Sequence, residues 1–381
     1  MFSSSANIMA MLGDFRIEGM MMRYSAFVPR LYNFCKSLGF ESGKIMPSRA
    51  FCSDESQGYP IILLAKHFGT FPFNHGQVGG VVATDRHGPH AEHGKDMVII
   101  QASHVGYDPA SEKFGTYRRV QTEHGDMTAS CGKIESVLDW YENEYAFAQD
   151  NMFLERQGDD HLVIIDNQLL NENREEGLFL NLDKMVKRQE NREILPLKSY
   201  STSKCYLASN AFRDLLRGYD WPTGRRERLG ARLRPELFRY KREIADDLEG
   251  RDHLERNLFN PMAWIVTSPS PLLAAAKINT QVEFDRSFRT IVKEHRYWGK
   301  KLAYIAGLNI DISPQPGQVF PLTKFVPWAA YVQDTDGSHY TLEQSELMAK
   351  LKEQSSDNPD QIDLEEAIQV MGAAQEIRIT I

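Results

Sequence analysis

The stretch from Phe51 to Gly132 constrains this chain most, because two cysteines in it bracket a histidine. Cys52 opens the stretch, His104 follows an apolar run, and Cys131 closes it. Thiolate and imidazole are ligands that zinc prefers, and a catalytic zinc site has three protein ligands and a fourth position open to water. The spacing is too wide for a zinc finger, so the fold must bring the three residues together. Taken singly, each cysteine is more often an ordinary buried residue, and the prediction of Zn²⁺ as cofactor depends on the whole set.

A carboxylate, Asp54, lies two residues after the first cysteine. There it can accept a hydrogen bond from a zinc-bound hydroxide and orient it, or swing onto the metal and close the open position. To stay ionised and correctly aimed it needs a cation, ideally a bidentate arginine. Arg118 and Arg119 stand between the second and third predicted ligands, and the spacing leaves open which of them serves.

The composition is that of an ordinary globular protein, with 42% hydrophobic and 25% charged residues in 381. The formal net charge of −8 argues against a nucleic-acid binder, which needs a basic surface. No apolar run is long enough to span a bilayer, and the first residues have no basic start typical of a secretory signal. Four cysteines in so long a chain do not make a disulfide framework, which favours a reducing, cytoplasmic location.

The clearest strand of the sequence covers residues 96–102. Its continuous apolar run fits a strand buried on both faces, as in a parallel sheet covered by helices, and residues 162–166 and 302–312 read as further strands. His104 comes after this strand, at the end where open α/β sheets hold their ligands. A helical pattern follows Cys131, and a helix N-terminus favours a thiolate. We therefore predict an α/β fold with a mainly parallel central sheet flanked by helices, and with additional helical segments.

Three parts are expected along the chain. Residues 1–44 form an N-terminal helical segment, residues 45–345 a zinc-binding α/β domain, and residues 346–381 a C-terminal tail. Within the domain, residues 210–260 are rich in arginine and are predicted to form a helical insertion. Acidic residues interleave with these arginines, which favours a solvated, salt-bridged surface over an anion or partner site.

Several motifs together resemble the limiting-CO2-inducible protein B family, zinc proteins related in structure to the β-class carbonic anhydrases. The motifs are Cys52-Ser53-Asp54, Ser103-His104-Val105-Gly106-Tyr107-Asp108-Pro109, the arginines after Gly115-Thr116-Tyr117, and Ser130-Cys131-Gly132. The Gly79-Gly80 pair and residues 306–310 are similar to the family as well. The resemblance covers about residues 45–330 and is strongest over 52–132.

The resemblance implies a β-carbonic-anhydrase-like fold and a role for each matched residue. Cys52, His104 and Cys131 become the zinc ligands, Asp54 the gatekeeping carboxylate, and Arg119 its dyad partner. The implied function is the reversible hydration of carbon dioxide to bicarbonate by zinc-bound hydroxide, in a homodimer. The partners are then carbon dioxide and bicarbonate, with neither nucleic acid nor membrane.

Two alternatives from other classes stay open. The first is a catalytically inactive zinc protein that binds bicarbonate or a protein partner in a structural or regulatory role. The second is another zinc hydrolase, for which Glu55 is the near candidate base, although it faces away from Asp54 if the segment is extended.

The loop after the two glycines departs from the family pattern, since it carries His87, His90 and His93 at three-residue intervals. A second metal site lacks an acidic or thiol ligand to complete it. We favour a solvent-facing loop with one histidine near the zinc as a proton shuttle.

Overall fold

The computed structural model describes residues 13–82, 96–118, 127–189, 193–318 and 320–375. The chain divides into two compact units. The main unit takes its residues from 11–133, 248–250 and 276–381, and the inserted unit takes its residues from 134–247 and 251–275.

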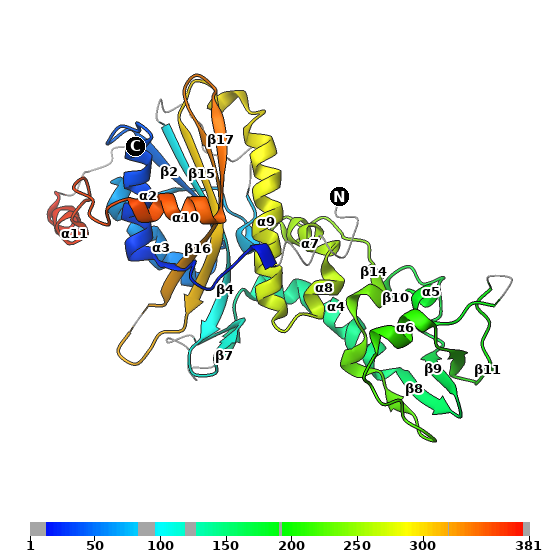
Figure 1. Ribbon diagram of the computed structural model, residues 1–381. Coiled ribbons are helices and arrows are strands. Elements are labelled where there is room, and N and C mark those ends of the chain that lie inside the picture. The colour runs from blue at the N-terminus through cyan, green and yellow to red at the C-terminus, as the bar shows by residue number, and fades with distance from the viewer. Residues whose placement is uncertain (1–12, 83–95, 119–126, 190–192, 319, 376–381) are drawn as a thin grey trace, which may run out of the picture. The chain divides into compact units, whose positions relative to one another are not determined.

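The main unit is built on one large mixed sheet (Figure 1). Four neighbouring strands, β15, β4, β2 and β3, are parallel to one another. Strand β16 runs antiparallel to each of its neighbours, β1, β15 and β17. This confirms the predicted α/β fold with a mainly parallel central sheet. The strand order is β1 (Met22–Arg23), β16 (Leu322–Gln333), β15 (Leu302–Ile312), β4 (Asp96–Asp108), β2 (Ile45–Ala50) and β3 (Phe73–Asn74), with β17 (His339–Glu343) on β16 and β5 (Lys113–Phe114) on β4.

Helices cover both faces of this sheet, as the apolar run in β4 predicts. Successive side chains of a strand point to opposite faces, so Val98 and Ile100 join one core and Met97 and Ile99 the other. The first core is covered by α2 (Tyr24–Ser37), α3 (Gly58–Phe68) and α10 (Gln344–Glu353), and the second by the part of α9 (Pro271–Ile291) that belongs to the main unit.

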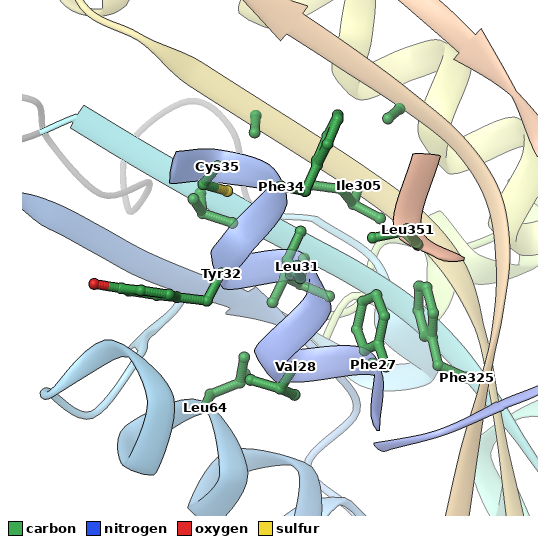
Figure 2. Packing of buried hydrophobic residues seen from close by; sticks show 14 of the residues in the cluster. Phe27, Val28, Leu31, Tyr32, Phe34, Cys35, Leu64, Ile305, Phe325 and Leu351 are labelled. Atoms are coloured by element: carbon green, nitrogen blue, oxygen red, sulfur yellow. The ribbon is translucent and has the colours of Figure 1, made fainter. Parts of the chain in front are cut away.

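Helix α2 shows how the sequence pattern becomes packing (Figure 2). Phe27, Leu31 and Phe34 recur at helical spacing and are at most 2% exposed. Phe27 stacks on Phe325 of β16 with ring centroids 4.0 Å apart, and α3 contributes Leu64 to the same core. Burying each such side chain stabilises the fold by about 1.5–3 kcal/mol, which anchors the N-terminal helical segment to the sheet.

The inserted unit has its own, antiparallel sheet. The predicted strand at 162–166 is β9 (Asp160–Asp166), which pairs with β8 and β12. A separate antiparallel ribbon joins β10 to β14. The remaining elements of this part of the chain are α4 (Gly132–Asp150), β8 (Met152–Gln157), β10 (Gly177–Leu180), α5 (Leu182–Met185), β11 (Lys198–Ser199), β12 (Ser203–Leu207), α6 (Asn210–Leu215), β13 (Glu227–Arg228), β14 (Phe238–Lys241), α7 (Arg251–Phe259) and α8 (Met262–Val266).

The arginine-rich segment 210–260 is only partly helical, which corrects the predicted helical insertion. Between α6 and α7 lie the strands β13 and β14. In β14, Phe238 and Tyr240 are buried while Arg239 and Lys241 are exposed. This period of two is the pattern of a strand, and the density of arginines in the sequence obscured it.

The chain after residue 346, predicted as a tail, begins inside α10. Leu347 and Leu351 of that helix are fully buried in the core of the main unit. Beyond it lies α11 (Leu364–Ala373), which has no buried residue.

Candidate metal centre

The structure brings Cys52, His104 and Cys131 together. Their candidate ligand atoms all lie within 4.8 Å of one another, and all three residues are buried. Cys52 comes two residues after β2, His104 belongs to the neighbouring parallel strand β4, and Cys131 immediately precedes α4. His104 lies inside its strand rather than after its end, because β4 stays paired with β15 up to Tyr107 and with β5 up to Asp108.

A buried carboxylate fixes the ring of His104. Its Nδ1 is 2.9 Å from Oδ2 of Asp311, and both side chains are fully buried. Its Nε2 has no hydrogen-bond partner of ordinary geometry among the described residues. A metal-ligating histidine typically donates its other N–H to a carboxylate, which sets the tautomer and the ring orientation. The arrangement leaves Nε2 for a metal ion.

The same carboxylate also holds the turn that follows Asp54. Ser56 Oγ and Gln57 Nε2 donate to Oδ2 of Asp311 over 2.9 and 2.7 Å. Thr323 Oγ1 donates to the other oxygen over 3.0 Å. Asp311 therefore ties the imidazole of one predicted ligand to the turn that carries the predicted gatekeeping carboxylate.

Asp311 belongs to this hydrogen-bonded group but to none of the sequence motifs. It lies on β15, and in the parallel register Asn309 is the partner of His104 and Asp311 that of Gly106. Both polar side chains interrupt the predicted apolar strand 302–312 at alternate positions, and both are fully buried. Two polar residues on one face of a buried strand are a sequence feature that could have indicated a polar site at this place.

A glycine loop supports the first thiol. The backbone N–H of Gly79 donates to Sγ of Cys52 over 3.4 Å. Asn279 of α9 donates to the carbonyl of Gly79 over 3.0 Å and to Ser103 Oγ over 2.9 Å. Gly80 has φ of +81°, and a Cβ there would lie 2.1 Å from the carbonyl oxygen of Ala102, so only glycine lets this loop approach the strand.

The two sulfurs are 3.8 Å apart, and either thiol can donate a hydrogen bond to the other. Donation by the Cys131 thiol lowers the pKa of Cys52, against the effect of burial, and His104 and the Gly79 N–H add to this. The same hydrogen bond, together with burial, raises the pKa of the Cys131 thiol. Burial disfavours the charged imidazole, but the Cys131 sulfur and Asp311 outweigh it and raise the pKa of His104. Anionic charge in a buried place is costly unless paired, and a divalent cation would neutralise it.

Asp54 caps the short 3₁₀ turn Glu55–Gln57, because its Oδ1 accepts the N–H of Ser56 over 3.1 Å. Burial raises the pKa of this carboxyl, but the charge of His104 and the Ser56 N–H outweigh it, so the net shift is downward. Asp54 is thus favoured as an anion beside the cluster.

The predicted partners of Asp54 are less defined. Arg118 ends β6 (Thr116–Arg118), which pairs with β7 (Met127–Ala129), and its side chain is exposed. Arg119 lies outside the described residues, as do His87, His90 and His93. The dyad and the histidine loop therefore stay predictions.

Two thiols and an imidazole nitrogen, with a carboxylate behind the imidazole, fit a metal ion held by three protein ligands. The fold and the site thus define an α/β protein with a buried Cys-His-Cys group able to bind a metal.

No protein-family model and no curated protein matches the chain. Among solved structures, it is similar to PtLCIB4, a homologue of the limiting CO2-inducible protein LCIB. The TM-score is 0.50 at 12% identity, over 89% of this chain and 99% of that one. LCIB itself aligns with a TM-score of 0.44 at 12% identity, over 86% of this chain and 96% of that one. The similarity to PtLCIB4 shows that the chain has the fold of the limiting CO2-inducible protein LCIB family, which confirms at the level of the fold the resemblance seen in the sequence.

The described part of the chain contains no helix that is long and apolar enough to cross a membrane.

Proposed function

We propose that this chain is a zinc carbonic anhydrase that interconverts carbon dioxide and bicarbonate. The observation that carries the proposal is the buried Cys52–His104–Cys131 cluster, in which Nε2 of His104 has no hydrogen-bond partner of ordinary geometry among the described residues. Two thiolates and one imidazole are a donor set of the zinc type, and three protein ligands leave a fourth position for water. The LCIB-like fold supports the same reading.

Each residue then has a distinct task. Cys52, His104 and Cys131 would hold the ion, and Asp311 would keep the imidazole of His104 in one tautomer. Bound zinc lowers the pKa of a coordinated water to about 7, which supplies a nucleophile at neutral pH. Asp54 accepts a hydrogen bond from the attacking water and orients it toward carbon dioxide, while the Ser56 N–H holds the carboxylate in place.

A cation beside Asp54 completes the proposal. Arg119 is the proposed partner, which would keep the carboxylate ionised and aimed. The proton released in hydration leaves through a buffer or a histidine of the loop that contains His87, His90 and His93.

Stopped-flow carbon dioxide hydration, with zinc content measured on the same sample, tests this function. We expect zinc near one per chain and rapid hydration. The Asp54→Ala variant should keep its zinc and lose about a hundredfold or more of the rate, the range of a positioned proton-handling group. Glu41→Ala is the matched control, because it removes an exposed carboxylate of the same unit that is paired with Lys44 and should leave hydration unchanged.

The other outcomes separate the alternatives. Full hydration by Asp54→Ala would remove that residue from the mechanism. A requirement for Glu55 instead would favour another zinc hydrolase. Full zinc without hydration from neutral to alkaline pH would favour a protein that binds bicarbonate or a partner without turnover.

The homodimer is a proposal that comes from the resemblance alone. Light scattering on the purified protein should give twice the chain mass of 43.6 kDa. The mass of a single chain would reject it.

A further inference from the structure

The inserted unit contains a cavity of about 790 Å³ beside the β10–β14 ribbon. Pockets that bind small molecules commonly have volumes of about 300–1,000 Å³ and mostly apolar walls with a few placed polar groups. All residues that line this cavity come from positions 169–241, so it is separate from the Cys-His-Cys cluster.

The floor of the cavity is apolar. Leu169 and Phe179 line it and are 4% and 8% exposed. Leu170, Leu182 and Ile194 extend it and are half-buried. This floor offers a surface for the hydrocarbon or aromatic body of a ligand.

Three cationic side chains line the cavity, and two of them come from alternate positions of one strand. Arg239 and Lys241 project from the exposed face of β14. In the ribbon, Arg239 pairs with Phe179, and cross-strand partners share a face of the sheet. Lys241 pairs with Gly177, beside which the side chains of Arg174 and Glu144 lie. A third cation, Lys184, comes from α5.

These three cations differ from their neighbours in having no carboxylate within ion-pair distance among the described residues. Other arginines of the same unit are paired, such as Arg226 with Glu155 and Arg228 with Asp150. Two carboxylates also line the cavity, and one of them, Asp183, is paired with Arg188. Three unpaired cations thus face one carboxylate without an ion pair, that of Glu172.

We propose that this cavity binds a small amphipathic anion. Its carboxylate, sulfonate or phosphate head is held by Arg239, Lys241 and Lys184, and its apolar body lies on the floor of Leu169, Phe179 and their neighbours. Charge-assisted hydrogen bonds to the head supply orientation and part of the affinity, and burial of the body supplies the rest of the affinity. The inserted unit is then a ligand-binding unit, and this inference does not depend on the proposed carbonic anhydrase activity.

Binding of 8-anilinonaphthalene-1-sulfonate to the full-length protein, followed by fluorescence, tests the proposal. Dodecanoate should displace the probe, whereas dodecanol, which lacks the charge, should displace it about tenfold or more weakly. The double variant Arg239→Ala/Lys241→Ala should bind dodecanoate about tenfold or more weakly, because two charge-assisted contacts are lost. The control Lys187→Ala/Arg225→Ala removes two exposed cations of the same unit outside the cavity and should bind as the wild type does.

A second variant tests the floor independently of charge. Leu170→Trp fills part of the cavity and should weaken the binding of dodecanoate, while the protein keeps its cooperative unfolding transition. Equal binding by both double variants, or displacement by dodecanol as strong as by dodecanoate, would overturn the site. Displacement by inorganic phosphate as strong as by dodecanoate would overturn the amphipathic class. Carbon dioxide hydration, measured on the same variants, should not change.

Discussion

The polar groups around His104 are buried, whereas the charged groups on the arginine-rich surface of the inserted unit are exposed to solvent. Around His104, Asp311 and Asn309 are fully buried and hydrogen-bonded. On the inserted unit, Arg228 and Asp150 form an ion pair with side chains 64% and 61% exposed. A buried polar group is costly unless every partner is in place, whereas an exposed pair contributes little. The comparison teaches that the polar groups around the candidate site are those whose hydrogen-bond partners the fold supplies inside the core, whereas the exposed charges depend little on theirs.

The largest expected effect is loss of the metal when a buried thiol of the cluster is removed. Cys131→Ala deletes one of three ligands, so zinc content measured by mass spectrometry should fall from about one per chain to near zero. The matched control is Cys205→Ala, because Cys205 is also buried, at 5% exposed, but lies in the sheet of the inserted unit. Equal zinc content in the two variants would contradict the metal centre.

A smaller loss is expected from the carboxylate behind His104. Asp311→Asn keeps the size of the side chain but removes the charge that orients the imidazole. Loss of such an outer partner typically weakens metal binding about 10- to 100-fold, which chelator competition with Co²⁺ would measure. Asp285→Asn is the control, since Asp285 is 60% exposed and paired with Arg289 on α9. An unchanged affinity in Asp311→Asn would show that the ring of His104 is held by packing alone.

The glycine loop should respond more weakly again. Asn279→Ala removes the donor to the carbonyl of Gly79 and to Ser103 Oγ. A buried acceptor left without a partner costs about 1–3 kcal/mol, so the free energy of unfolding in urea should fall by that amount. Arg289→Ala, on the exposed face of the same helix, should change it little. If both variants unfold alike, Asn279 does not clamp the loop.

Much of the main unit could be predicted because its signals are local. The run at 302–312 matches β15 residue for residue, and the run at 96–102 lies within β4. The helix expected after Cys131 is α4. An apolar strand or an amphipathic helix is recorded in neighbouring residues, so a single sequence is enough to find it.

The rest depends on contacts between distant residues. Asp311 is 207 positions from His104, and only the parallel register of β15 and β4 places it behind the imidazole. Asp54 lies two residues after Cys52, so its proximity to that residue follows from the sequence alone. The β10–β14 ribbon could not be predicted in the same way, because the exposed Arg239 and Lys241 of its second strand hid the alternation of Phe238 and Tyr240.

The smallest effect should come from the exposed pair of the inserted unit. Arg228 Nη1 lies 2.9 Å from Oδ1 of Asp150, and a double-mutant cycle with Arg228→Ala and Asp150→Ala isolates this interaction. We expect a coupling free energy of about 0.2–1 kcal/mol, which should decrease in 1 M salt because screening shortens the range of exposed charges to about 3 Å. A coupling as large as the Asn279→Ala effect, and insensitive to salt, would mean that this surface is held as rigidly as the interior around His104. The contrast between the two regions would then fail, and the paired arginines would have to be treated as structural elements rather than as a solvated surface.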